Sequence, residues 1–209
     1  PVLVGTGGTA AEDVIELSST IVEGEDDLFK AIYLIGEWVN ENIEYELDEE
    51  TEFNVKDSDW VFENRYGACD EITNMFMAMV RSLGIPARYV GGYAFTDIDD
   101  IERFESHAWA EVYFPDYGWV PYDITYGQFG FVDISHITLG ERLCSSENAV
   151  QIEMKGIDVD ILGKGIEINA DVNELKGSVN PEVEINAEFF KDEVDFGSYN
   201  IVKAKVKNK

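Results

Sequence analysis

Residues 65–83 read RYGACDEITNMFMAMVRSL, and the organisation of the chain can be interpreted from this stretch. From Ile72 onward its apolar residues recur at intervals of three and four, the spacing that places side chains on one buried face of a helix. Gly84 and Pro86 follow at the position where such a helix ends. The stretch therefore predicts a buried amphipathic helix with Cys69 in its first turn.

The first turn of a helix is a chemically significant place for a thiol. Unpaired backbone N–H groups and the positive end of the helix dipole favour the thiolate, which is the form that attacks a carbonyl carbon. Gly67 allows a tight turn into the helix. Asp70 and Glu71 suit a helix start, but their negative charges oppose thiolate formation. We therefore expect a cationic group from elsewhere in the chain beside Cys69.

Composition indicates a globular protein of one large core or two small ones. The chain has 209 residues, of which 45% are hydrophobic and 12% aromatic. Its net charge of −28 argues against binding to nucleic acid or to an anionic membrane surface. The charge has two interpretations, attraction of cationic substrates such as Lys-rich peptides or a solubilising surface, and the second is the simpler. No apolar run approaches the ~18 residues of a membrane span.

The ends of the sequence and its two cysteines bear on the origin of the chain. It begins at Pro1 without a Met or a signal-peptide pattern, and we interpret it as a piece of a longer protein. Cys69 and Cys144 do not form a dense framework, and we expect no disulfide between them because it would disable Cys69. An acidic domain followed by a β-rich module favours an exported or surface-attached protein.

Three regions are expected along the chain. Residues 1–24 form an N-terminal extension, in which residues 5–10 match G-x-G-x-x-A, although the following helix (residues 10–17) is too short for a dinucleotide-binding unit. Residues 25–144 form an α+β domain, in which a helix over 26–43 and the Cys69 helix pack on an antiparallel sheet. In residues 145–209, polar and apolar residues alternate between Gly and Asn-Pro turns, which predicts a small all-β, sandwich-like domain.

The predicted sheet supplies a base for the cysteine and a group to orient that base. Strands are expected over 88–95, 107–114 and 119–125, with an irregular stretch up to His136. If residues 114–118 form a five-residue loop between the second and third strands, Tyr113 pairs with Trp119 and Asp123 is the diagonal neighbour of His107 on the same face of the sheet. A loop of even length would put the two residues on opposite faces. Cys69 as nucleophile, His107 as base and Asp123 as orienting carboxylate are the parts that nucleophilic catalysis requires.

Other residues are candidates for a supporting role or for a different site. The backbone N–H of Cys69 is one expected oxyanion donor, and the indole of Trp60 is a candidate for the second. A dyad of His136 with Cys144 lacks an orienting group, and zinc held by the two cysteines and two histidines lacks the close spacing of structural zinc ligands. Calcium could be bound by residues 97–102, but they lack the spacing of an EF-hand loop. We expect no cofactor and no metal.

Three motifs carry a resemblance to a known family, the transglutaminase-like superfamily of papain-fold thiol enzymes. They are YGACDE at 66–71, VRSLGIPARYVGGY at 80–93, and SHAWAEV at 106–112 continuing to GWVPYDIT at 118–125. The resemblance covers roughly residues 28–140 and implies a papain-like core with a Cys-His-Asp triad at Cys69, His107 and Asp123. The family's usual Asp-Pro-Thr is Asp-Ile-Thr here, which leaves the orienting carboxylate in place.

The resemblance implies attack on an amide carbonyl, release of an amine, and a thioester that water or another amine resolves. Because water is always available as acceptor, we favour a peptidase or amidase acting on a peptide or protein substrate. A cross-linking protein-glutamine gamma-glutamyltransferase is the enzymatic alternative. A non-catalytic cell-surface binding or spacer module, in which the cleft only recognises peptides, is the other.

Overall fold

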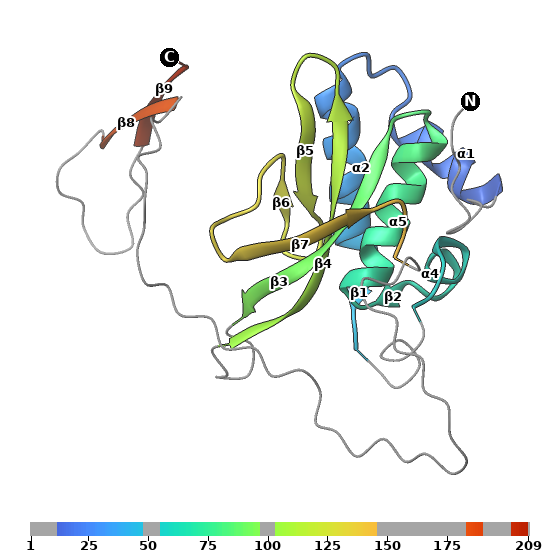
Figure 1. Cartoon of the computed structure of the whole chain (residues 1–209). Helices are drawn as coiled ribbons and strands as arrows, with labels where there is room; N and C mark the ends of the chain where they lie inside the picture. Colours follow the sequence, from blue (N-terminus) through green and yellow to red (C-terminus); the bar gives the residue numbers. More distant parts are fainter. Residues whose placement is uncertain (1–11, 48–54, 97–102, 146–182, 190–201, 209) are drawn as a thin grey trace, which may run out of the picture. The chain divides into compact units, whose positions relative to one another are not determined.

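The structure, a computed structural model, describes residues 12–47, 55–96, 103–145, 183–189 and 202–208. The chain divides into two compact units, residues 1–169 and 170–209, and each unit is described here by itself. The first unit combines helices with an antiparallel sheet (Figure 1). Its fold is the α+β arrangement of helices on an antiparallel sheet that the sequence predicts.

Two of the four described helices of the first unit begin at an aspartate N-cap. In α2 the Asp27 side chain accepts a hydrogen bond from the Lys30 N–H, the contact of an N-cap. In α4 the Asp57 side chain accepts from the Trp60 N–H in the same way. The bounds of the four helices are α1 Glu12–Ile21, α2 Leu28–Asn42, α4 Ser58–Asn64 and α5 Cys69–Ser82.

The main sheet has five strands in the order β6-β5-β4-β3-β7. Every pair of neighbouring strands in this sheet is antiparallel. Strand β3 lies between β4 and the edge strand β7 (Figure 1). The strands are β3 Ala87–Thr96, β4 Arg103–Phe114, β5 Gly118–Asp123, β6 Gln128–Phe129 and β7 His136–Arg142. A separate two-residue pair joins β1 Glu44–Tyr45 to β2 Tyr66–Gly67 in parallel.

The predicted cysteine helix is α5, and Cys69 is its first residue, as the sequence indicates. The apolar face of α5 is buried among α1, α2, α4 and the sheet. Its fully buried side chains include Met75, Phe76, Met79 and Val80, and the ring of Phe76 stacks on that of Tyr122 from β5. The core therefore fixes the start of α5 against the strands that carry the histidines.

The register of the β4–β5 hairpin is the predicted one. Tyr113 pairs with Trp119, and the loop that joins the strands has the odd length that the prediction requires. The loop is shorter than expected, because Phe114 and Gly118 also pair and only residues 115–117 remain between them. Gly118 has φ +89°, a left-handed conformation that glycine adopts without strain.

Some sequence predictions of local structure were wrong. The strand predicted from residue 107 begins earlier, at Arg103, as β4. Residues 132–135 are irregular as expected, and β7 begins at His136. Helix α4, from Ser58, lies in a stretch for which no helix is predicted. These elements are short or lie at a sheet edge, where local hydrophobic periodicity is weak.

The close approach of β7 to β3 depends on Gly92. The register between these strands shifts between Gly91 and Gly92, and a Cβ on Gly92 would lie 2.1 Å from the carbonyl oxygen of Ile137. We expect Gly92→Ala to lower the free energy of unfolding by about 3 kcal/mol, because backbone atoms cannot move aside as a flexible side chain can. Denaturant unfolding measures the change. Gly140→Ala is the matched control on β7, since nothing lies within 4 Å of its added Cβ, and an equal loss in both variants would contradict the argument.

In the second unit the described residues form one antiparallel pair, β8 Val183–Phe189 with β9 Val202–Asn208. Both strands lie where alternation of apolar and polar residues predicts them. The other strands of the expected sandwich-like domain lie outside the described residues, as do the G-x-G-x-x-A match at 5–10 and the acidic stretch at 97–102. None of the described helices is long and apolar enough to cross a membrane.

Candidate active site

His107 and Asp123 meet in the interior of the sheet. The Nε2 atom of His107 lies 2.7 Å from Oδ2 of Asp123, and the two side chains are 6% and 0% exposed. The other carboxylate oxygen, Oδ1, accepts the backbone N–H of Tyr126 at 3.0 Å. Since an ionised carboxylate only accepts hydrogen bonds, Nε2 of His107 carries a proton, and Nδ1 is the nitrogen left to act as a base.

Cys69 is a free, partly exposed cysteine that adjoins the strand carrying His107. The backbone of Ala108, the residue after His107, hydrogen-bonds the Cys69 side chain. The same residue's carbonyl oxygen accepts a hydrogen bond from the Thr73 hydroxyl one turn further along α5, at 3.3 Å. These two contacts dock the first turn of α5 on β4 at the position of the histidine.

The electrostatics of Cys69 differ from the expectation of a thiolate favoured by the helix start. Burial raises the pKa of the Cys69 thiol, and the charges of Asp70, Asp123 and Glu71 raise it further, while the Ala108 hydrogen bond acts in the opposite direction. The protonated thiol is therefore the resting form. A base must remove the proton as the sulfur attacks, which is the task of a neutral imidazole.

Glu71 stabilises the approach to the helix. Its buried carboxylate accepts the backbone N–H of Ala68 at 3.0 Å and that of Lys56 at 2.9 Å, so that it returns to the helix start as in a capping box. The side chain crosses directly over Gly67, where a Cβ would lie 2.3 Å from that of Glu71. Gly67 is thus required by the packing of Glu71, a more specific reason than the tight turn inferred from sequence.

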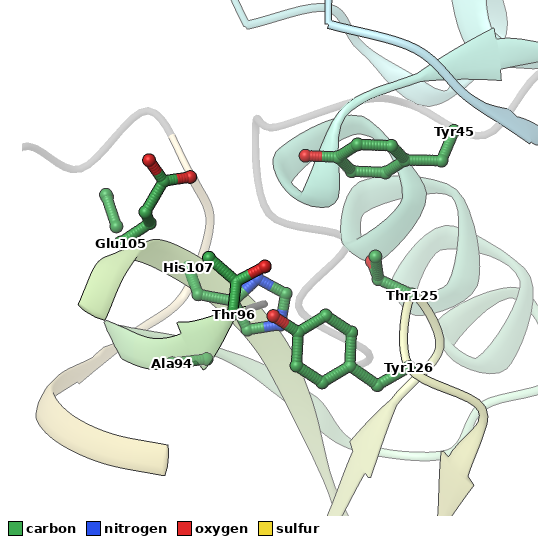
Figure 2. A pocket seen from close by; sticks show the side chains of 8 residues that line it. Tyr45, Ala94, Thr96, Glu105, His107, Thr125 and Tyr126 are labelled. Carbon is green, nitrogen blue, oxygen red and sulfur yellow. The ribbon is translucent and has the colours of Figure 1, made fainter. Parts of the chain in front are cut away.

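A pocket of about 270 Å³ opens beside His107. Figure 2 shows Tyr45 and Tyr126 reaching it from different elements, β1 and the turn after β5, with the hydroxyl of Tyr45 directed inward. The ring of Tyr126 stacks on His107 with a centroid distance of 4.6 Å. The remaining lining residues are Ala94, Thr96, Glu105, Ser106 and Thr125. The pocket joins the imidazole to solvent.

Tyr45 is a site residue that the sequence interpretation did not single out. The pairing of β1 with β2 places it directly opposite Gly67, two residues before the cysteine. Burial raises the pKa of Tyr45 to about 12, and the negative charges of Glu105 and Asp70 act in the same direction. Its hydroxyl therefore stays protonated and can donate a hydrogen bond into the pocket. The indole of Trp60, the candidate named from sequence, packs edge-on against Tyr66 and beneath the ammonium group of Lys56.

The Asp-Ile-Thr turn after β5 is anchored from α2. Ile124 is buried against Gly36, and its carbonyl oxygen accepts the side-chain amide of Asn40 at 2.7 Å. Isoleucine at this position therefore fills an apolar space and leaves the Asp123 carboxylate free to face the histidines. The hydroxyl of Thr125 is buried, lines the pocket and has no hydrogen-bond partner within the described parts of the chain, so that it can bind a substrate group.

The second histidine also meets Asp123. Nε2 of His136 lies 2.9 Å from the same Oδ2 atom that His107 contacts. Both cysteines are free, as predicted. The second cysteine, Cys144, is buried and follows Leu143, whose carbonyl oxygen accepts a hydrogen bond from the Arg81 guanidinium.

A metal ion is an alternative to protons in this cluster, because ligand atoms of His107, Asp123 and His136 all lie within 4.8 Å of one another. In a tetrahedral zinc site with bonds of about 2.1 Å, neighbouring ligand atoms are about 3.4 Å apart. The distances of 2.7 and 2.9 Å are instead those of charge-assisted hydrogen bonds. The geometry therefore favours hydrogen bonds from the two histidines to Asp123 over a metal ion bound by all three residues.

Comparison with known proteins agrees with this fold. Residues 15–124, more than half of the chain, match the family model of the transglutaminase-like superfamily. The chain therefore belongs to the transglutaminase-like superfamily, whose members are usually catalytic. Among solved structures, a candidate cysteine protease from Cytophaga hutchinsonii superposes with a TM-score of 0.58 at 22% identity, over 72% of this chain and 48% of that one, which shows a shared fold.

Two curated relatives share part of their sequence with the chain. YebA of Bacillus subtilis, an uncharacterised protein, is 30% identical over 131 residues, 56% of this chain and 18% of the relative. A protein-glutamine gamma-glutamyltransferase of Pseudomonas aeruginosa is 34% identical over 74 residues, 32% of this chain and 11% of the relative. The chain thus spans less than a fifth of the length of either relative.

Proposed function

We propose that this chain is a thiol enzyme that cleaves amide bonds of a peptide or protein through a thioester on Cys69. One observation supports this most directly: Cys69 is docked against β4, and this strand carries His107, whose side chain is buried against Asp123 of β5. Catalysis by a thiol requires a nucleophile, a base and a group that fixes the base, and these three side chains supply them.

The reaction follows from which nitrogen of the imidazole is free. Nδ1 of His107 takes the proton of Cys69 while Sγ attacks the carbonyl carbon, and the protonated ring then gives the proton to the departing amine. In the second half, a water molecule transfers a proton to Nδ1 and its oxygen attacks the thioester carbon. The acid product leaves, and the proton returns to Cys69. Asp123 holds Nε2 throughout, so that the ring keeps one orientation.

The oxyanion formed on attack needs hydrogen-bond donors. The backbone N–H of Cys69, at the first position of α5, is one of the N–H groups that a helix leaves without an internal acceptor. The Tyr45 hydroxyl is our candidate for the second donor, because β1 holds it beside Gly67 and it remains protonated. The indole of Trp60 is the competing candidate.

A pair of variants separates these donors. We expect Tyr45→Phe to lower kcat by about 10²-fold with a smaller change in KM, because a transition-state hydrogen bond is lost. Trp60→Phe, which retains an aromatic ring against Tyr66, is expected to keep more than a third of the activity. Steady-state kinetics on a peptide substrate measure both. The reverse order of effects would assign the second donor to Trp60.

The pH dependence of alkylation tests the resting state of the thiol. Since the pKa of Cys69 is raised, its thiolate fraction is small at neutral pH and grows only at alkaline pH. In a Cys144→Ala background, the rate of iodoacetamide reaction with Cys69 should therefore still be rising above pH 9, beyond the ordinary thiol pKa of about 8.5. A rate that levels off below pH 7 would instead indicate a preformed thiolate–imidazolium pair.

Hydrolysis is favoured over transfer because the pocket is open, with Glu105 and Ser106 exposed at its rim. Water can therefore reach the thioester without a dedicated acceptor site. The second candidate, protein-glutamine gamma-glutamyltransferase activity, is favoured by the name of the Pseudomonas relative and by the carboxylate of Glu105, which could attract an amine. Turnover of peptide amides with and without a primary amine distinguishes them: hydrolysis yields free acids in both, whereas transfer yields the new amide.

A non-catalytic recognition module is the third alternative. Detection of a covalent acyl adduct on Cys69 distinguishes an enzyme from such a module. Incubation with a library of peptide amides followed by rapid acid quench should yield an acyl group on Cys69, detectable by mass spectrometry of the intact chain. Binding of peptides without any adduct or turnover would support the recognition module and overturn the proposal.

A further inference from the structure

His136 reaches Asp123 from the opposite side of β3. It is the first residue of β7 and pairs with Ala94 of β3, while His107 of β4 pairs with Gly92 of the same strand. The His136 side chain is only 1% exposed. Its ring lies edge-on to Trp109, with centroids 5.2 Å apart. The fold therefore buries a second histidine against the carboxylate of the proposed triad.

Both ring nitrogens of His136 face carboxylate oxygens. Nε2 is 2.9 Å from Oδ2 of Asp123, and Nδ1 is 3.1 Å from Oδ1 of Asp133. A neutral imidazole has one N–H donor and one acceptor, so it would present a lone pair to one of these oxygens. The Ser135 hydroxyl also lies 3.4 Å from Nδ1, but its proton is donated to Oδ1 of Asp133. Only the imidazolium form can donate to both carboxylates. The hydrogen-bond pattern by itself thus indicates a cation.

The second carboxylate is held in place by its own partners. Oδ2 of Asp133 accepts the Gln128 side-chain amide at 2.7 Å, and Oδ1 accepts the Ser135 backbone N–H at 2.9 Å as well as the Ser135 hydroxyl. These hydrogen bonds hold the pKa of Asp133 well below its usual value, and the bond from the Ser135 hydroxyl has the largest effect. Asp133 is therefore an anion with a fixed orientation toward His136.

The groups around His136 together favour its charged form. Burial lowers the pKa of His136, but the hydrogen bonds and charges of Asp123 and Asp133 outweigh burial, and the pKa is raised. The other rings that face it are His107 and Tyr126, with centroids 5.7 and 5.6 Å away, and Trp109, which carries no charge. Burial likewise raises the pKa of Asp123, but the hydrogen bonds from both histidines outweigh it and the pKa is lowered.

We propose that His136 is a positioning residue, a buried imidazolium that donates to Oδ2 of Asp123 and fixes that carboxylate for His107. This inference rests on the proposed thiol chemistry and extends it. A buried carboxylate needs charge compensation. Because His136 supplies that compensation, the ring of His107 is not needed as the positive partner of Asp123, and its Nδ1 atom can accept the proton of Cys69.

The protonation state can be observed without substrate. The chain has only two histidines, so long-range ¹H–¹⁵N spectra of the full chain labelled with ¹⁵N-histidine show two rings. We expect one ring with both nitrogens protonated at pH 7.5, and we expect it to be the ring missing from His136→Gln. A neutral tautomer for His136 at pH 7.5 would overturn the proposal. This readout is independent of turnover, so it stands even if no amide substrate is found.

Kinetics test the positioning role. In His136→Gln the charge of Asp123 acts on His107 alone and favours the protonated ring, so the neutral base forms only at higher pH. We expect kcat/KM to fall about tenfold at pH 7 and the acid limb of its pH profile to move up by about one pH unit. Asp133→Asn should move the acid limb of the pH profile in the same direction by a smaller amount. This second variant tests the proposal if His136→Gln does not fold.

Ile134→Ala, at a 92% exposed position two residues before His136, is the control and should leave the profile unchanged. A purely structural role would lower the melting temperature and the active fraction without moving the limb, and that result would overturn the proposal. Loss of activity of the unsubstituted chain on chelation, together with one metal ion per chain by elemental analysis, would also overturn it in favour of a metal site.

Discussion

Cys69→Ala abolishes turnover and leaves the fold intact: this is the largest effect that we expect. The acyl group has no other thiol to bind in the pocket, because the second cysteine, Cys144, is buried and is not one of the residues that line the pocket. We expect kcat to fall about 10⁴-fold or more, to the background of the assay. The substitution removes one sulfur atom from a partly exposed position. The free energy of unfolding, measured with denaturant, should therefore change by less than about 1 kcal/mol.

Cys144→Ala is the matched control for this experiment. It removes the other free thiol from a buried position, so it should cost some stability and no catalysis. Circular dichroism and the denaturant midpoint report the fold, and release of acid from a peptide amide reports the activity. Retained turnover in Cys69→Ala would exclude the thioester mechanism, whatever the state of the histidines.

Asp123→Asn is expected to have the second largest effect, a decrease in kcat of about 10³- to 10⁴-fold with little change in KM. An asparagine amide can present its N–H₂ group to Nε2 of His107, which stabilises the tautomer with the proton on Nδ1. That tautomer cannot accept the proton of Cys69, and the protonated ring formed during attack also loses its negative partner. The backbone should change little, because the amide oxygen can still accept the Tyr126 N–H.

The pH profile gives this prediction a specific signature. Asp123→Asn removes the negative charge shared by both histidines, so the acid limb should move to lower pH, opposite to the shift expected for His136→Gln. A stability loss alone would lower the rate at every pH by the same factor. Unchanged kcat in Asp123→Asn would remove the carboxylate from the proposed triad.

The sequence could predict the elements that have strong local patterns. The apolar face of α5, the acidic N-cap of α2 and the hairpin between β4 and β5 all follow from hydrophobic spacing and turn residues. The contact between His107 and Asp123 followed from the odd loop length alone, because side chains alternate faces along a strand. These inferences need only neighbouring residues.

Tyr45 and His136 could not be found in this way. Tyr45 reaches the site through a two-residue strand that pairs with residues about twenty positions later, and such a strand has no periodicity. Strand β7 is an edge strand with several exposed apolar residues, including Ile137 and Leu139, so no buried face alternates with a polar one. Its neighbour β3 precedes it by about forty residues, and only the assembled sheet shows that the two histidines share one carboxylate.

The edge position of β7 has a consequence for protein production. A truncated form ending at residue 124 would contain the whole span that the family model matches, and the three residues Cys69, His107 and Asp123 with it. It would lack β7, and with it the histidine that faces Asp123 from across β3. During translation this strand leaves the ribosome after every other strand of the main sheet. Expression vectors for a minimal domain should therefore extend at least to Arg142.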